Sequence, residues 1–458
     1  MMTFKPFHAA ARFGLGGSRK DLAAIGARPD DWVMAQVESK ADMTVTGIAD
    51  SRSQLIAYQK FAIANREARQ SRETDVEAFK MRQQTYRHGV RDRVLDQLSK
   101  RFSFAVTTDN PVKERFAQFW SNHFTVSRAN KPQISALCAA FENEAIRPML
   151  DQHFTEMLLK VAAHPAMLMY LDNFQSVGPN SIAGRRRRLG INENFAREVM
   201  ELHTVGVDGG YTQQDVQSLA RILTGWTIGN DRLVRFGAKP GEFAFSRLLH
   251  EPGPQTLLGK SYPESGVKQG IDALTDLSLN PATATHIATK LVTHFVSDTP
   301  SAADIGFVAN VFRKSDGHLP SVHKAVVSLT SAWRGESRKL KTPYELLVST
   351  WRGLTLPVDR FRPVIGVLRD MNDIPFSAPS PAGWPDSAEA WGAPAMIKER
   401  VEWGIAAGRK LGNYFNPMEA AKYIVDPDAE LLLASIRRAE SPAQGLSILL
   451  SSPDFQWR

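Results

Sequence analysis

The chain has 458 residues, of which 43% are hydrophobic and 23% charged, and its formal net charge is +8. These values are typical of a globular protein with a large core, and the lack of an apolar run of about 20 residues argues against a membrane span. Cys138 is the only cysteine, which excludes an intrachain disulfide and a cysteine-ligated metal cluster. Its apolar helical surroundings predict an inert core residue.

The N-terminal residues, Met1 to Pro6, do not form a secretory signal peptide, because no basic segment precedes an apolar stretch. We therefore expect a cytoplasmic protein by default. A periplasmic location, reached by export together with a signal-bearing partner, stays open as the alternative.

Residues 54–104 are predicted to form a long charged helical stretch. Glu and Arg or Lys recur there at three- and four-residue spacings, which favours exposed helices. The mixed charges between Arg66 and Arg93 predict a solvated helix face. The aromatic residues expected to anchor this stretch to the body are Tyr58, Phe61, Phe79 and Tyr86.

A second helix is predicted after Asn110-Pro111, since proline suits a helix start. An aromatic face follows with helical spacing and ends at His123, which is either a core histidine or a ligand. Two more helices are predicted in residues 133–173. Asp172 ends the second one before a Gly/Pro/Ser loop; it either faces a cleft or is a plain turn residue.

The segment Gly190–Trp226 predicts a helix, a tight glycine turn and a second helix. Asn192 is suited to cap the first helix, which is expected to end near Gly206. Thr212 and Asp215 have the spacing of a capping box for the second helix.

A polar stripe on the first of these helices suggests a site. Asn194, Glu198 and Glu201 share one face, about 100° from an apolar face. Partly buried carboxylates must be paired, hydrogen-bonded or metal-bound. One interpretation is a divalent-metal or acid–base site that also includes His203. The other is a structural ion-pair network with Arg197 or the nearby arginine run.

The arginine run consists of Arg185, Arg186, Arg187 and Arg188. Guanidinium groups suit an anionic ligand such as phosphate or an acidic polysaccharide, so these four are candidate anion-binding residues. The run is equally compatible with a surface loop. No recognisable nucleic-acid module accompanies it, so nucleic-acid binding is not expected.

The sequence NENFAREVMELHTVGVDGGYTQQDVQSLARILTGW resembles the signature of a bacterial family, the domain of unknown function 1800 (DUF1800), and further matches run along most of the chain. The resemblance supplies no reaction, because the activity of the family is unsettled. Genes of the family often neighbour those of DUF1501 proteins, which commonly carry twin-arginine export signals. The resemblance therefore implies a DUF1501-type protein as a possible partner.

The remaining chain predicts further helices, interrupted by a less helical part at residues 227–265. A short strand is expected within 236–245, and a β-hairpin from residues 249–253 and 257–260. Later helices are predicted at about 281–295, 303–313, 319–333, 397–408, 417–424 and 427–438, with another after Thr342. The Pro/Gly/Trp-rich residues 374–396 predict an ordered covering loop, whose Trp384 and Trp391 either stack on sugar rings or plug the core.

We therefore predict a mainly α fold: one large helical domain, residues 1–334, with a small β-hairpin insertion near 235–260. Residues 335–458 form a helical segment packed on it through the Trp/Pro-rich loop. The residues predicted to converge in a site are His123, Asp172, Asn194, Glu198, Glu201 and His203. Their assigned roles are metal binding for His123, Asn194, Glu198 and Glu201, and catalysis for Asp172, Glu198, Glu201 and His203.

Two functions stay open. One is a metal-dependent hydrolase acting on an anionic envelope or carbohydrate substrate, with a divalent metal as its possible cofactor. The other is a non-catalytic helical partner of a DUF1501-type exported protein. A deep cleft with unpaired acids favours the first, and fully paired acids with a broad apolar surface favour the second.

Overall fold

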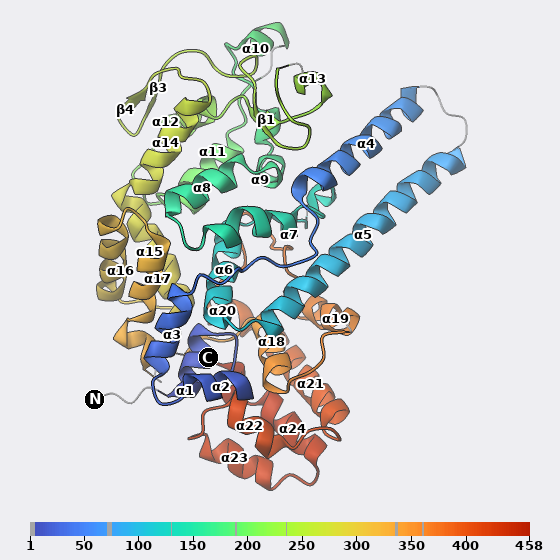
Figure 1. The fold of residues 1–458 in the computed structure, drawn as a ribbon, viewed down its shortest axis with the longest axis vertical. Coiled ribbons are helices and arrows are strands. Elements are labelled where there is room, and N and C mark those ends of the chain that lie inside the picture. The colour runs from blue at the N-terminus through green and yellow to red at the C-terminus, as the bar shows by residue number, and fades with distance from the viewer. Residues whose placement is uncertain are drawn as a thin grey trace.

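The protein is mainly helical, and its computed structural model describes residues 5–70, 76–129, 131–187, 190–234, 236–334, 338–359 and 361–458 (Figure 1). Within these residues the strands form two separate two-stranded antiparallel sheets. The expectation of a mainly α, single large domain is therefore confirmed. No helix in the described ranges is long and apolar enough to cross a membrane.

One large apolar core organises the body, and segments from Ala9 to Trp333 contribute to it. The first body helices are α1 (Pro6–His8), η1 (Ala9–Phe13), α2 (Arg19–Ile25), α3 (Pro29–Glu38) and α6 (Pro111–His123). Next come η2 (Pro132–Ile134), α7 (Cys138–Phe141), η3 (Glu142–Ile146), η4 (Arg147–Met149), α8 (Phe154–Ala163), α9 (Pro165–Tyr170), η5 (Asn173–Gln175) and α10 (Ile182–Arg187). The body ends with α11 (Asn194–Glu198), η6 (Val199–His203), α12 (Gln213–Ile222), α13 (Asp231–Val234), α14 (Val267–Leu279), α15 (Pro281–Phe295), α16 (Ala302–Lys314), α17 (Leu319–Val327) and η7 (Thr330–Trp333). Cys138 is buried in this core, as expected.

Helix α6 lies at the centre of the body and is buried on nearly every side (Figure 1). Asn110 starts it, because its side chain accepts a hydrogen bond from the Lys113 backbone N–H at 3.1 Å and Pro111 fills the first turn. Its aromatic residues Phe116 and Trp120 are fully buried. The predicted helix start at Asn110-Pro111 is confirmed.

Helices α4 (Ser51–Gln70) and α5 (Val76–Thr107) form an arm that extends away from the body (Figure 1). The predicted long helical stretch is therefore confirmed as a pair of helices. The Phe61 and Tyr86 rings stack between them, with ring centroids 3.7 Å apart. The C-terminal half of α5 enters a second apolar core through Leu98 and Phe102.

The sheets differ in position from the prediction. Strand β1 (Trp226–Ile228) pairs with β2 (Phe243–Phe245), and β3 (Gln255–Leu257) pairs with β4 (Lys260–Tyr262). A hairpin strand expected at residues 249–253 does not form. The reason is that Glu251 is buried and binds the side chain and backbone N–H of Asn180, while Pro252 has no N–H for a ladder.

The C-terminal segment carries α18 (Pro343–Gly353), α19 (Arg362–Asp370), α20 (Ala388–Trp391), α21 (Pro394–Leu411), α22 (Pro417–Ile424), α23 (Glu430–Arg437), α24 (Pro442–Ser451) and α25 (Pro453–Gln456). A third apolar core lies among these helices. Helices α24 and α25 are not among the predicted elements. The chain end returns to the body side, where the backbones of Lys339 and Arg458 exchange hydrogen bonds of 2.8–2.9 Å.

Candidate functional site

The predicted helix of the site is present, but it changes from an α-helix to a π-helix after Glu198. Helix α11 begins beside Asn192, whose side chain accepts a hydrogen bond from the Asn194 N–H at 2.9 Å. From Val199 to His203 the helix continues as a π-helical turn and then stops before Gly206, which has a φ of +81°. The capping box of Thr212 and Asp215 on α12 is confirmed.

The two glutamates of this helix are half-buried, and they are not equivalent. Glu201 forms an ion pair with Arg197 at 3.2 Å and accepts a hydrogen bond from the Tyr211 hydroxyl. Burial and this hydrogen bond raise the pKa of Tyr211 to about 12. Glu198 has no hydrogen-bond or ion-pair partner among the described residues. Burial, and then the charge of Glu201, raise the pKa of Glu198 above its ordinary value.

The two histidines lie inside the core instead. The ring centroids of His123 and His203 are 6.1 Å apart, and His123 Nε2 lies 3.3 Å from the His203 carbonyl oxygen. Burial lowers the pKa of His203 to about 3 and that of His123 well below its ordinary value, so both rings are neutral. They are buried core histidines.

The other predicted site residues are more exposed than these two rings. Asp172 forms an ion pair with Lys131 at 2.6 Å, and its side chain is 45% exposed. Asn194 is exposed. No group of three or more His, Cys, Asp and Glu in the described residues is placed to hold a metal ion. The ligand set expected from His123, Asn194, Glu198 and Glu201 is therefore not assembled: the imidazoles are turned into the apolar core, while the carboxylates stay near the surface.

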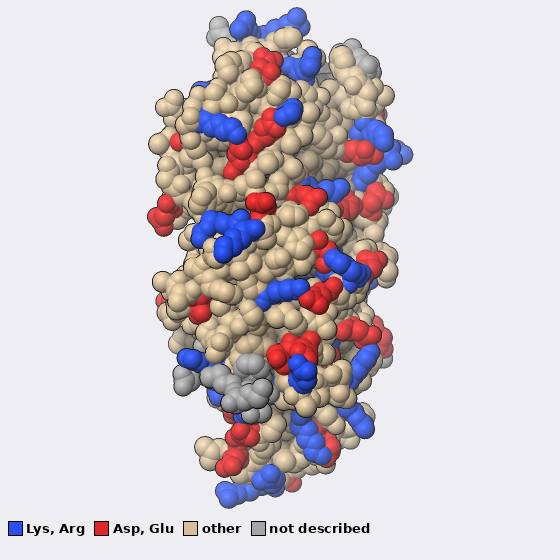
Figure 2. Space-filling model, turned by 60° about the vertical axis from the view of Figure 1, so that its left-hand side comes forward, with Lys and Arg blue, Asp and Glu red and all other residues tan. Residues whose placement is uncertain are grey.

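The arginine run lies on α10 and beyond it. Arg185 and Arg186 are exposed, whereas Arg188 and the side chain of Arg187 lie outside the described residues. On the face shown in Figure 2, basic and acidic side chains are interspersed. Anion binding by this run stays a prediction.

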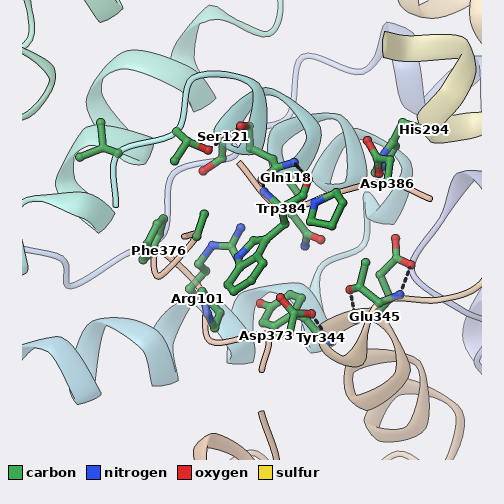
Figure 3. Close-up of a pocket in the computed structure, with 17 residues that line it drawn as sticks. Arg101, Gln118, Ser121, His294, Tyr344, Glu345, Asp373, Phe376, Trp384 and Asp386 are labelled. Carbon is green, nitrogen blue, oxygen red and sulfur yellow. Dashed lines mark hydrogen bonds and ion pairs between the residues drawn. The ribbon is translucent and has the colours of Figure 1, made fainter. Parts of the chain in front are cut away.

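A cavity of about 110 Å³ lies between the body and the C-terminal segment, and the sequence did not identify it as a site (Figure 3). Its walls come from α5, α6, α15, α18 and the loop between α19 and α20. One water needs roughly 10–15 Å³ of such volume, so the cavity admits a small ligand group. The polar lining residues include Arg101, Gln118, Ser121, Asn122, His294, Tyr344, Glu345, Asp373, Trp384 and Asp386.

A histidine–aspartate pair lies at one side of this cavity (Figure 3). His294 Nδ1 and Asp386 Oδ1 are 2.6 Å apart, and the two side chains are 12% and 21% exposed. Burial lowers the pKa of His294 despite the opposing effect of Asp386, so the ring is neutral and its Nδ1–H donates to the carboxylate. Nε2 is buried and has no partner among the described residues, which leaves its lone pair available as a base.

Another wall of the cavity carries a buried carboxyl group, that of Asp373. Asp373 accepts a hydrogen bond from the Tyr344 backbone N–H at 2.8 Å. Burial raises the pKa of Asp373 to about 7, so a large fraction of this carboxyl keeps its proton at neutral pH. Glu345 behaves differently: burial raises its pKa, but the guanidinium groups of Arg115 and Arg458 lower it well below the usual range. The two carboxyl groups therefore differ in protonation: Asp373 can donate a proton near neutral pH, whereas Glu345 stays ionised.

Two hydrogen-bond donors of the cavity are buried without a partner in the described structure, Tyr344 Oη and Trp384 Nε1. The Trp384 indole lies in the middle of the group in Figure 3. Its backbone is fixed from α6, since Trp384 N–H donates to Asn122 Oδ1 at 2.7 Å and Asn122 Nδ2 donates to Trp384 O at 2.9 Å. Trp391 is buried, and the centroids of its ring and the Trp384 ring are 5.8 Å apart. Trp391 therefore belongs to the core.

The signals for this cavity were present in the sequence but weak. His294 lies in the amphipathic helix predicted at about 281–295, where a histidine commonly packs against its neighbours. Trp384 stands in the predicted covering loop, and that loop does cover a cavity. Asp373 carries no spacing signal, because its raised pKa depends on burial that only the folded chain produces.

Comparison with known proteins adds a family and nothing further. A family model described as "Protein of unknown function (DUF1800)" matches residues 8–457, which confirms the resemblance over nearly the whole chain. No curated protein and no solved structure matches the chain.

Proposed function

This chain belongs to the DUF1800 family, and we propose that it is a hydrolase that cleaves a glycosidic bond by acid–base catalysis in the cavity beside Trp384. The observation that carries the proposal is the set of buried, unpartnered polar atoms around that cavity: Tyr344 Oη, Trp384 Nε1 and His294 Nε2. A buried polar group without a partner costs about 1–3 kcal/mol, so three of them around one hollow are best explained by a bound ligand.

The roles follow from the protonation states. His294, held by Asp386 in the tautomer with a free Nε2, accepts a proton from the attacking water. Asp373 donates its proton to the oxygen of the leaving sugar as the glycosidic C–O bond breaks. A base that is neutral and an acid that is protonated near pH 7 are the pair that this reaction needs.

The carbohydrate class is supported by the lining. An indole suits the apolar face of a sugar ring, and the amides of Gln118 and Asn122 suit its hydroxyl groups. This proposal keeps the hydrolase and carbohydrate parts of the sequence hypothesis. It moves the site from α11 to the cavity and assigns no step to a metal ion.

The test is a hydrolysis screen. The purified protein is incubated with neutral and acidic polysaccharides, and new reducing ends are counted. We expect release by the wild type, a loss of about 100-fold or more in His294→Gln, and normal release in the control His153→Gln, whose ring lies outside the cavity. Equal activity in His294→Gln and wild type would overturn the proposal.

A second candidate, the non-catalytic partner of a DUF1501-type protein, is supported by the arm. Ile63 and Met81 on α4 and α5 are 46% and 67% exposed, which suits a protein contact. Co-purification with a DUF1501-type protein tests this role: the double variant Ile63→Asp/Met81→Asp should abolish the complex, whereas Leu431→Asp, on an 87% exposed residue far along the chain, should not.

A further inference from the structure

A second hollow lies where the arm joins the body, and it is larger and basic. Its volume is about 590 Å³, within the usual range of roughly 300–1,000 Å³ for ligand pockets. Helices α4, α5 and α19 and the segment after α6 form its walls. Its lining residues are Tyr58, Phe61, Gln83, Tyr86, Arg87, Val90, Arg91, Val94, Leu95, Arg128, Gln133, Ser135, Ile365, Arg369 and Ile374. We call this hollow the basic groove.

Among the described residues, the lining of the basic groove includes four arginines and no carboxylate. Arg87 and Arg91 are four residues apart on α5 and therefore share one face of the helix. Arg128 and Arg369 come from other elements. None of the four is paired with an acidic side chain in the described residues. Arg87, Arg91 and Arg369 are exposed and Arg128 is half-buried, whereas the buried arginines Arg101 and Arg147 are paired with carboxylates.

The like charges oppose one another. Burial and the nearby charge of Arg369 lower the pKa of Arg128, and its Nε donates only to the Ser377 hydroxyl, at 3.1 Å. Several guanidinium groups that converge without a counter-ion repel each other, and an anion between them removes that cost. The groove therefore suits a ligand with more than one negative charge.

The other residues that line the groove indicate the chemical class of this ligand. Tyr58 provides an aromatic surface, while Gln83, Gln133 and Ser135 provide amide and hydroxyl groups that match sugar hydroxyls. A nucleic acid would need open ring faces for its bases, but Phe61 and Tyr86 are stacked on each other at 3.7 Å and 6°. The combination favours a carbohydrate with carboxylate or sulfate groups.

The groove and the Trp384 cavity share one wall, residues 373–375. Asp373 and Pro375 line the cavity while Ile374 between them lines the groove. On α5, Arg101 of the cavity follows Leu95 of the groove by six residues, about 9 Å along the helix. The groove and the cavity are therefore neighbours in the fold.

We propose that the basic groove binds an acidic oligosaccharide through Arg87, Arg91, Arg128 and Arg369. This deepens the proposed function by giving the substrate an anionic part, and it rests on that function only for the cleavage itself. Binding is measurable without turnover, so failure of one proposal is distinguishable from failure of the other.

The experiment is calorimetric titration of the full chain with hexagalacturonate, with maltohexaose and a thymidine hexanucleotide as comparison probes. The test variant is Arg87→Gln/Arg91→Gln. The control is Arg437→Gln/Arg438→Gln, which removes the same charge from exposed residues at the end of α23. We expect hexagalacturonate to bind, Kd to rise about tenfold or more in the test variant, and Kd to change less than about twofold in the control.

Three results would overturn the inference: no binding of hexagalacturonate, equal weakening in both double variants, or tighter binding of the hexanucleotide. If the wild type binds hexagalacturonate but cleaves no glycan, the groove stands and the hydrolase proposal fails.

Discussion

Two groups of buried charges lie next to each other along α6, and they differ in whether their polar atoms are paired. In the first, Glu142 binds Arg101 at 2.9 Å and Arg147 at 2.6 Å, and Arg147 binds Glu114 at 2.6 Å. In the second, the Trp384 cavity, the acid Asp373 has no cationic partner and three polar atoms lack any partner in the described structure. Both groups contain buried charges, so charge alone does not distinguish them; the unpartnered polar atoms around the cavity do.

The pKa values show the same difference. Burial raises the pKa of Glu142, but Arg101 and Arg147 then lower it to about 2, so the carboxylate is ionised at all ordinary pH values. Burial raises the pKa of Asp373 to about 7, and the hydrogen bonds from Tyr344 and Thr342 and the charge of Arg400 offset this only in part. One group stabilises the fold, and the other keeps a proton available for chemistry.

The largest effect is expected from breaking the paired group. Glu142→Gln leaves Arg101 buried without its carboxylate partner and Arg147 with Glu114 alone, and we expect a loss of about 3–5 kcal/mol in the free energy of unfolding. Urea denaturation measures it. The control is Asp272→Asn, which removes an exposed pair with Lys268 and should cost under about 1 kcal/mol. A loss of the same small size in both variants would remove the distinction between the two groups.

The next effect is a pH dependence in the unpaired group. The pKa of Asp373 is raised from 3.8 in the unfolded chain to about 7 in the folded chain, so the stability linked to its proton is fully present below about pH 4 and lost as the pH rises through 7. Between these limits wild type should lose up to about 4 kcal/mol relative to Asp373→Asn. Urea unfolding of both proteins at pH 5 and pH 8 should show about 3 kcal/mol of this loss, because only the part between pH 5 and about 7 falls in that range. A difference that stays constant would contradict a pKa near 7.

The smallest effect is expected at Tyr344. The variant Tyr344→Phe removes a buried hydroxyl that has no partner in the described structure, so the free energy of unfolding should stay within about 1 kcal/mol of wild type or rise. Hydrolysis should fall, because the hydroxyl is available to the ligand. Destabilisation by several kcal/mol would mean that the hydroxyl is part of a structural network like that of Glu142.

Much of the fold could be predicted from the sequence, because it depends on local signals. Pro281 and Thr342 begin their helices as expected: Asn280 caps the first, and a Thr342–Glu345 capping box starts the second. The hairpin was placed a few residues too early, because the turn is set by Leu258 and Gly259, with φ of +48° and +76°. The leucine gives no sequence signal for that conformation.

The site could not be predicted in the same way. Helical spacing placed Glu198 and Glu201 on one stripe, but a π-helical turn follows Glu198 and the expected partners His123 and His203 are turned into the core. The acid and the base of the cavity, Asp373 and His294, are far apart in the chain. Only packing of the C-terminal segment on α6 brings them to one hollow, and no spacing rule covers that distance.

The most direct test of the catalytic assignment is the pH dependence of kcat/KM for glycan hydrolysis in wild type and Asp373→Asn. We predict that the wild-type rate falls as the pH rises through about 7, where Asp373 loses its proton, and that Asp373→Asn is slower by about 10²–10⁴-fold without that alkaline fall. An Asp373→Asn variant with the wild-type rate and pH profile would contradict the assignment of this cavity as the active site.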